Sequence, residues 1–149
     1  MRGIVVLGVV VLSGVGAAAQ EYQKYNDFLN RTEFYDYYGN MTGYAEYNDF
    51  LDRMEYYDSY GHLRKTESDN DLLRRKETKD RYGNTTETRS YNDLLDREEV
   101  RDSYGNIIGY RKWNDLLKRY EVYNSRGRTV GYYKYNDLLD RWEYHDKPY

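Results

Sequence analysis

The stretch YNDLLDREEVRDSYGNIIGYRK, residues 91–112, is one complete copy of the unit that decides the fold of this chain. Aligning the 149-residue sequence on itself at a period of 22 places six such units in register. Their first residues are Tyr25, Tyr47, Asp69, Tyr91, Trp113 and Tyr135. Asn-Asp follows the first residue of every unit, and an Arg and a Glu recur further along at fixed spacing. The repetition indicates one structural element that is copied six times.

Two turn signals alternate along each unit. In D-x-Y-G-N, as at 102–106, Asp at the first position and Gly at the fourth favour a type I turn with a left-handed Gly. The Asn-Asp pair is the second signal, because both side chains can hydrogen-bond their own backbone. Aromatic and β-branched residues dominate between the turns, as at 107–110. Each unit therefore predicts two antiparallel strands of roughly five to eight residues.

The fold class predicted from this pattern is all-β, with six antiparallel β-hairpins in an elongated meander. A parallel solenoid with one unit per coil is disfavoured, because identical charges would stack about 4.8 Å apart and repel by roughly 1 kcal/mol. In the meander we expect the Arg and Glu columns to form cross-strand pairs on a solvated face. Because the first and last strands would be complementary edges, we also expect head-to-tail self-association through them.

The alternative is a helix-containing solenoid, in which Asn92-Asp93 would cap a helix that ends before Gly105. Such a helix would need an apolar residue seven positions after each unit start to continue its Leu-Leu face. That column instead reads Thr32, Met54, Lys76, Glu98, Tyr120 and Trp142. The column favours the hairpin interpretation.

The first 19 residues have the features of a cleavable signal peptide. Arg2 precedes an apolar run over 4–15, and Ala17-Ala18-Ala19 supplies the small residues of a cleavage site. We therefore expect a secreted, extracellular protein with a single repeat domain over residues 20–149. After residue 19 the chain has 22 basic and 26 acidic side chains, a balance that argues against nucleic acid and anionic membranes as partners. It has no cysteine, so pairing, packing or assembly must replace disulfides.

Two resemblances follow from these residues. The unit YNDLLDRWEY followed by D-x-Y-G-N resembles the variant MORN repeats, which are β-hairpin arrays; the resemblance covers residues 22–146, although this unit lacks the Gly that usually follows Asn. The 21 tyrosines, the tandem repeats and the missing cysteines are similar to matrix proteins of mollusc shells and other hardened coverings. The second resemblance implies a structural, biomineral-associated matrix protein that contacts itself, matrix polysaccharide or mineral. The alternative is an extracellular binding module for carbohydrate or for weak, multivalent calcium binding.

Few residues carry chemistry of their own. No phosphate loop, HExxH motif or nucleophile elbow occurs, and six equal copies of paired carboxylates indicate structure, so we expect no enzyme, no catalytic residue and no bound cofactor. Calcium is the best candidate ligand, with Asp69 and Asp71 in the densest acidic cluster. Asn30, Asn40 and Asn84 begin N-glycosylation sequons. Oxidative coupling of tyrosines after secretion is a further hypothesis.

Overall fold

The computed structural model describes residues 21–147, which form twelve β-strands and no helix. The strands are β1 (Glu21–Asn26), β2 (Arg31–Tyr35), β3 (Met41–Asn48), β4 (Arg53–Asp58), β5 (Leu63–Asn70), β6 (Arg75–Asp80), β7 (Thr85–Asn92), β8 (Arg97–Asp102), β9 (Ile107–Asn114), β10 (Arg119–Asn124), β11 (Thr129–Asn136) and β12 (Arg141–Asp146). The prediction of two antiparallel strands per unit is confirmed. Within residues 21–147 no helix is long and apolar enough to cross a membrane. The predicted signal peptide lies outside the described residues.

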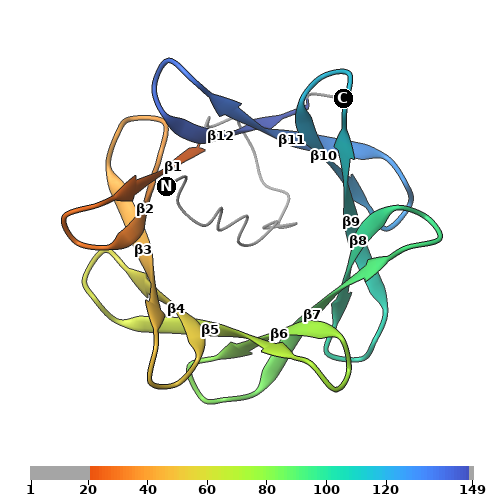
Figure 1. Ribbon diagram of the computed structural model, residues 1–149, viewed down its shortest axis with the longest axis horizontal. Coiled ribbons are helices and arrows are strands. Elements are labelled where there is room, and N and C mark those ends of the chain that lie inside the picture. Colours follow the sequence, from red (N-terminus) through yellow and green to blue (C-terminus); the bar gives the residue numbers. More distant parts are fainter. Residues whose placement is uncertain (1–20, 148–149) are drawn as a thin grey trace.

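The strands close into a barrel, in which each strand pairs with its neighbours along the chain and β1 pairs with β12 (Figure 1). The prediction of an elongated, open meander is therefore wrong. The predicted head-to-tail pairing depended on free edges at β1 and β12. These two strands pair with each other instead, with Tyr22 opposite Glu143 and Gln23 opposite Trp142. Closure is one of the ways in which β-proteins remove exposed strand edges.

Two kinds of turn connect the strands, one at each end of the barrel. In the D-x-Y-G-N turns the Gly takes a φ of 77° to 88°, and its N–H donates to the carbonyl of the first turn residue, as from Gly105 to Asp102 over 3.1 Å. In the Asn-Asp turns the Asn side chain accepts the backbone N–H three residues on, as Asn92 does from Leu95 over 3.1 Å. Both predicted turns are confirmed.

A β-bulge beside each of the five glycine-containing turns explains why the sheet curls. When a D-x-Y-G-N turn joins two strands, their pairing shifts by one residue, as between Phe34, which lies opposite Gly43, and Tyr35, which lies opposite Met41. The same shift recurs at the other four such pairs. Bulges bend a strand and increase its twist. Five bulges at equivalent positions coil the sheet until its edges meet.

The seam where the edges meet has the register of the other interfaces. Tyr22 lies opposite Glu143 at the seam, just as Tyr44 lies opposite Glu33 between β2 and β3. The Arg141 guanidinium lies 3.8 Å from the ring centroid of Tyr22. The barrel therefore has approximate six-fold symmetry about its axis, and the seam is the sixth equivalent interface.

The invariant residues build the outer surface of the barrel. In each unit the Glu carboxylate accepts hydrogen bonds from the Arg two residues before it and from the Asn at the start of the unit; for Glu99 these come from Arg97 Nε at 3.1 Å and Asn92 Nδ2 at 3.1 Å. The Arg and Glu lie on the same strand, so the predicted cross-strand pairing is wrong. The face is also less solvated than expected, because Glu99 is only 4% exposed. In four units a tyrosine ring covers the arginine of this pair, as Tyr110 does with its centroid 4.0 Å from Arg97.

Candidate functional site

The inner face of the barrel is where the six units differ. On a curved sheet, side chains on the concave face reach across an intervening strand, whereas contacts on the convex face join adjacent strands. Glu67 of β5 pairs with Arg89 of β7, and Phe34 of β2 stacks on Tyr56 of β4 at 6.3 Å between centroids. These contacts identify the inward columns. The residue types in these columns vary between units: the column of Glu67 and Arg89 also contains Gln, Ala and Tyr, and the column of Phe34 and Tyr56 also contains Thr and Val.

One arc of the inner face is aromatic and aliphatic. Val122 and Tyr133 form its buried centre, with Tyr120, Trp142 and Tyr144 packed around them. A second cluster, of Ala45 and Tyr56 with Phe34 and Met54 against it, lies on the other side of the seam. Burial raises the pKa of Tyr133 to about 12, because the interior disfavours the phenolate. This arc offers rings for stacking and a few hydroxyl groups.

The opposite arc, contributed by β5 to β9, carries charges. Arg89 pairs with Glu67 and lies 3.9 Å from Glu98, which in turn pairs with Arg111. Burial lowers the pKa of Lys65 to about 8, although the nearby carboxylates of Glu67 and Glu87 oppose the shift. Alternating signs within a partly buried network hold each side chain in place. The barrel interior is thus polarised across its width.

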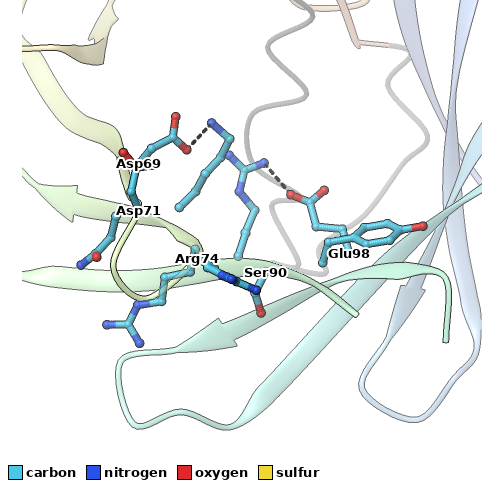
Figure 2. A pocket seen from close by; sticks show the side chains of 10 residues that line it. Asp69, Asp71, Arg74, Ser90 and Glu98 are labelled. Atoms are coloured by element: carbon cyan, nitrogen blue, oxygen red, sulfur yellow. Dashed lines mark hydrogen bonds and ion pairs between the residues drawn. The ribbon is translucent and has the colours of Figure 1, made fainter. Parts of the chain in front are cut away.

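A pocket of roughly 270 Å³ opens in the charged arc at the end of the barrel that carries the Asn-Asp turns (Figure 2). It is lined by Asp69, Asn70, Asp71, Arg74, Arg75, Lys76, Arg89, Ser90, Tyr91 and Glu98. The pocket lies where the third unit departs from the repeat pattern. In four other units the first residue is a tyrosine whose hydroxyl donates to the residue five positions on, as Tyr91 does to Asp96, and in the fifth unit it is Trp113, which donates to Asp115. In the third unit those two positions are Asp69 and Arg74.

Charges of both signs meet in this pocket. The Lys76 ammonium lies 2.9 Å from the Asp69 carboxylate, and Figure 2 shows Asp69 and Glu98 on opposite sides of the cationic groups between them. Four cationic and three anionic side chains line the walls, together with the hydroxyls of Ser90 and Tyr91. Such a mixture of donors, acceptors and one aromatic ring suits a polar, hydroxyl-rich ligand.

Two of the predicted site residues line the pocket, and the three sequon asparagines lie in exposed turns away from it. Asp69 and Asp71 are both in the pocket, but Asp69 is paired with Lys76, and no group of three or more metal-ligating side chains occurs within residues 21–147. Calcium binding stays a prediction. Asn30, Asn40 and Asn84 are exposed turn residues, Asn30 in an Asn-Asp turn and the other two after D-x-Y-G.

The sequence prediction missed the inward columns, although the signal for them was present. The position of Thr32, Met54 and Lys76 served only as evidence against a helix, yet it faces the interior. A column that varies between units while its neighbours stay constant marks residues that the shared scaffold does not use. Alternation along the strand then places such columns together on one face.

Comparisons with known proteins bear on the fold alone. No family model matches the chain, and no curated protein matches it. Among solved structures, it is similar to a protein from Arabidopsis thaliana known from X-ray analysis, with a TM-score of 0.63 over 87% of this chain and 80% of that chain. The two sequences are 13% identical, so the likeness shows a shared fold and carries no site residues.

Proposed function

We propose that this chain is a secreted structural protein of an extracellular matrix or hardened covering, in which the barrel is a rigid building block. The observation that carries the proposal is the orientation of the repeat: the columns that are the same in all six units build the outside of the barrel. The molecule therefore repeats the same Arg, Glu and Asn group six times around its outer surface. A partner with a repeating structure, such as a polysaccharide, a mineral face or another copy, can contact several units at once.

Tyrosine gives the outer surface a route to covalent linkage. Tyr38, Tyr60 and Tyr104 stand at turn tips with 84% to 89% of their surface exposed. With hydrogen peroxide and an extracellular peroxidase, two such phenols lose one hydrogen atom each and join through a ring-to-ring carbon bond, while the peroxide is reduced to two waters. Linkage between barrels would make the material insoluble without any cysteine.

The location of the protein tests this proposal. Extracellular material from the source is separated into soluble and insoluble fractions, and tryptic peptides of residues 21–147 are counted by mass spectrometry in each. Enrichment in the insoluble fraction, with dityrosine in its acid hydrolysate, is the expected result. A protein found free in extracellular fluid, with no peptides in the insoluble fraction, contradicts the proposal.

A second candidate function is an extracellular binding module, and the varied inner face favours it. A scaffold needs no change from unit to unit, yet the interior has an aromatic arc, a charged arc and the pocket around Asp69. Calorimetric titration with neutral and acidic oligosaccharides, and separately with calcium, tests this candidate. Lys76→Met removes the cation beside Asp69, and Lys134→Met, on an exposed outer position, is the matched control. Two results contradict a ligand site in the pocket: the wild type binds none of these ligands, or the two substitutions weaken the affinity by the same factor.

A further inference from the structure

The two ends of the barrel have different chemistry. Neighbouring strands run in opposite directions, so all turns of one kind lie at one end. The Asn-Asp rim consists of the turns 27–30, 49–52, 71–74, 93–96, 115–118 and 137–140. The Tyr-Gly rim consists of the turns 36–40, 58–62, 80–84, 102–106 and 124–128, and the described chain also begins and ends at this rim.

Each turn of the Asn-Asp rim has a large apolar side chain at its tip. Between 90% and 95% of the surface of these six residues is exposed: Phe28, Phe50, Leu72, Leu94, Leu116 and Leu138. The tips pack against nothing in the barrel, and the leucine after each tip is itself about half exposed, as Leu29 is at 45%. An apolar group repeated in this way around one rim indicates a contact surface.

Hydrogen-bond acceptors without donors stand beside these tips. The rim has nine aspartates and only two basic residues, Arg74 and Lys118. Only Asp115 among the aspartates that precede the tips is bonded, to Trp113 and Lys118. The carboxylates of Asp27, Asp49, Asp71, Asp93 and Asp137 accept no hydrogen bond and form no ion pair within the described residues. The Asn-Asp rim therefore combines apolar tips with acidic acceptors.

The Tyr-Gly rim supplies the complementary groups. Four of its five turns have, as their third residue, a tyrosine that is 74% to 89% exposed, at Tyr38, Tyr60, Tyr82 and Tyr104. The fifth turn has Asn124 in place of the aspartate, the exposed Arg126 in place of the tyrosine and the exposed Arg128 at its last position. The aspartates that begin the other four turns are engaged by backbone N–H groups, as Asp102 is by Asn106 at 2.9 Å. The exposed groups of this rim are thus aromatic rings, hydroxyl donors and guanidinium groups.

We propose that barrels assemble head to tail, with the Asn-Asp rim of one copy docked on the Tyr-Gly rim of the next. Apolar tips then pack on tyrosine rings, while tyrosine hydroxyls and the guanidinium groups of Arg126 and Arg128 donate to the free aspartates. The same Tyr-to-Asp bond already occurs within the barrel, from Tyr47 to Asp52. Two Asn-Asp rims facing each other would oppose acid to acid, and two Tyr-Gly rims would leave the apolar tips in water. The chemistry therefore selects the heterologous contact, which repeats without closing and makes a column of barrels.

The approximate six-fold symmetry strengthens this contact. Five turns and the two ends of the described chain lie around the Tyr-Gly rim, so one rotation brings four tips against the tyrosine turns and a fifth against the turn of Arg126 and Arg128. Contacts held on a rigid ring act together, and several weak ones give a strong association. This inference rests on the proposed structural role, since it names the surface through which building blocks join.

Two variants of the secreted protein test the inference. In the first, the six tips of the Asn-Asp rim are changed to Gln, which creates no N-glycosylation sequon after the preceding Asn-Asp; in the second, Tyr38, Tyr60, Tyr82 and Tyr104 are changed to Ser and Arg126 and Arg128 to Gln. All these side chains are exposed, so each variant should unfold at the wild-type urea midpoint within error. Sedimentation velocity of each protein alone and of an equimolar mixture, at about 1 to 500 μM, gives the size of the assemblies.

The expected result has three parts. The wild type forms a concentration-dependent series of oligomers, each variant alone is monomeric with association weakened at least about 30-fold, and the mixture forms dimers and nothing larger. The mixture can dimerise because each variant keeps the rim that the other lacks. Assembly of either variant alone overturns the head-to-tail geometry, and a monomeric wild type over the whole range overturns rim docking altogether.

These outcomes are separable from those of the proposed function. A monomer that is nevertheless abundant in the insoluble matrix overturns rim docking while the structural role stands. Columns formed by a protein that occurs only in fluid leave rim docking in place and contradict the structural role.

Discussion

Closure of the barrel makes a quantitative prediction at its seam. The Arg141 guanidinium lies 3.8 Å from the ring centroid of Tyr22, and the equivalent pair within the sheet, Arg119 over Tyr132, is at 3.9 Å. The two arginines have almost equal exposure, 22% and 20% of the side chain. A cation–π contact that is partly desolvated contributes about 1 kcal/mol. If the barrel is closed, both pairs should contribute this amount.

A pair of double-mutant cycles measures the two contributions. Tyr22→Ala, Arg141→Ala and the double variant form one cycle, and Tyr132→Ala, Arg119→Ala and their double variant form the control cycle. Urea unfolding followed by tryptophan fluorescence gives each free energy of unfolding, and the interaction energy is the departure from additivity. Each cycle cancels the other contacts of these side chains, such as the pairing of Arg141 with Glu143.

We expect coupling of about 1 kcal/mol in both cycles. Tyr22 and Arg141 lie near opposite ends of the sequence, so they interact only when β1 and β12 are paired. Coupling below about 0.3 kcal/mol at the seam, with about 1 kcal/mol in the control, would refute the closed barrel and restore an open sheet. Loss of coupling in both cycles would show instead that the cation–π contact is weaker than its geometry indicates.

Three further predictions concern the scaffold. Gly43→Ala would push a Cβ into the backbone carbonyl oxygen of Tyr57, and should lower the free energy of unfolding by about 1–3 kcal/mol in urea, whereas Thr42→Ala beside it should change it by less than about 1 kcal/mol. Acid should destabilise the barrel. Burial raises the pKa of Glu55, but hydrogen bonds from Tyr57 and Arg53 outweigh this effect, so the pKa of Glu55 in the folded protein lies below 4.5. The contribution of Glu55 to stability is therefore full above pH 4.5 and is lost as the pH falls through the folded pKa. A urea midpoint at pH 3 equal to that at pH 7 would contradict this. Alkali should also destabilise the barrel, because the hydrogen bond from Tyr57 to Glu55 raises the pKa of Tyr57 to about 12. The contribution of Tyr57 to stability is full below pH 10 and is lost between pH 10 and 12. Absorbance at 295 nm should show a class of tyrosines that ionise at higher pH than the others, and this class should vanish in denaturant.

Local features of the fold could be predicted from the sequence because each depends on neighbouring residues. The turn at 102–106 needs Asp at its start and a left-handed Gly, and both are visible in the letters. The prediction of the Asn-Asp turn was less complete. The last residue of this turn also takes a positive φ, and it is Asn or Asp in four units but Arg74 and Lys118 in the other two. Short polar side chains favour that conformation, and the two basic residues adopt it because the turn around them imposes it.

The closed shape could not be predicted in the same way. The curvature of the sheet accumulates from the extra residue in each bulge, such as Thr42. A β-branched residue at this position also suits a regular strand, so its type does not mark the bulge in the sequence. The same limit applied to the interior. Glu67 and Arg89 occupy the same column in successive units, and only the curled sheet brings them together across β6. The constant columns, on which the prediction depended, lie on the outside of the barrel, whereas the varied columns contain the candidate site.

The register of the seam has a consequence for the gene that encodes the chain. Tandem repeats gain and lose copies by unequal recombination, and an open array tolerates this because its ends are unaffected. In this ring one unit more or fewer would still close in register, since every interface is alike, but it would change the circumference by two strands. Inward contacts that span a strand, such as Phe34 on Tyr56, would then be pulled apart or crowded. Copy number is therefore expected to be held at six in descendants of this gene, even where the inward residues change freely.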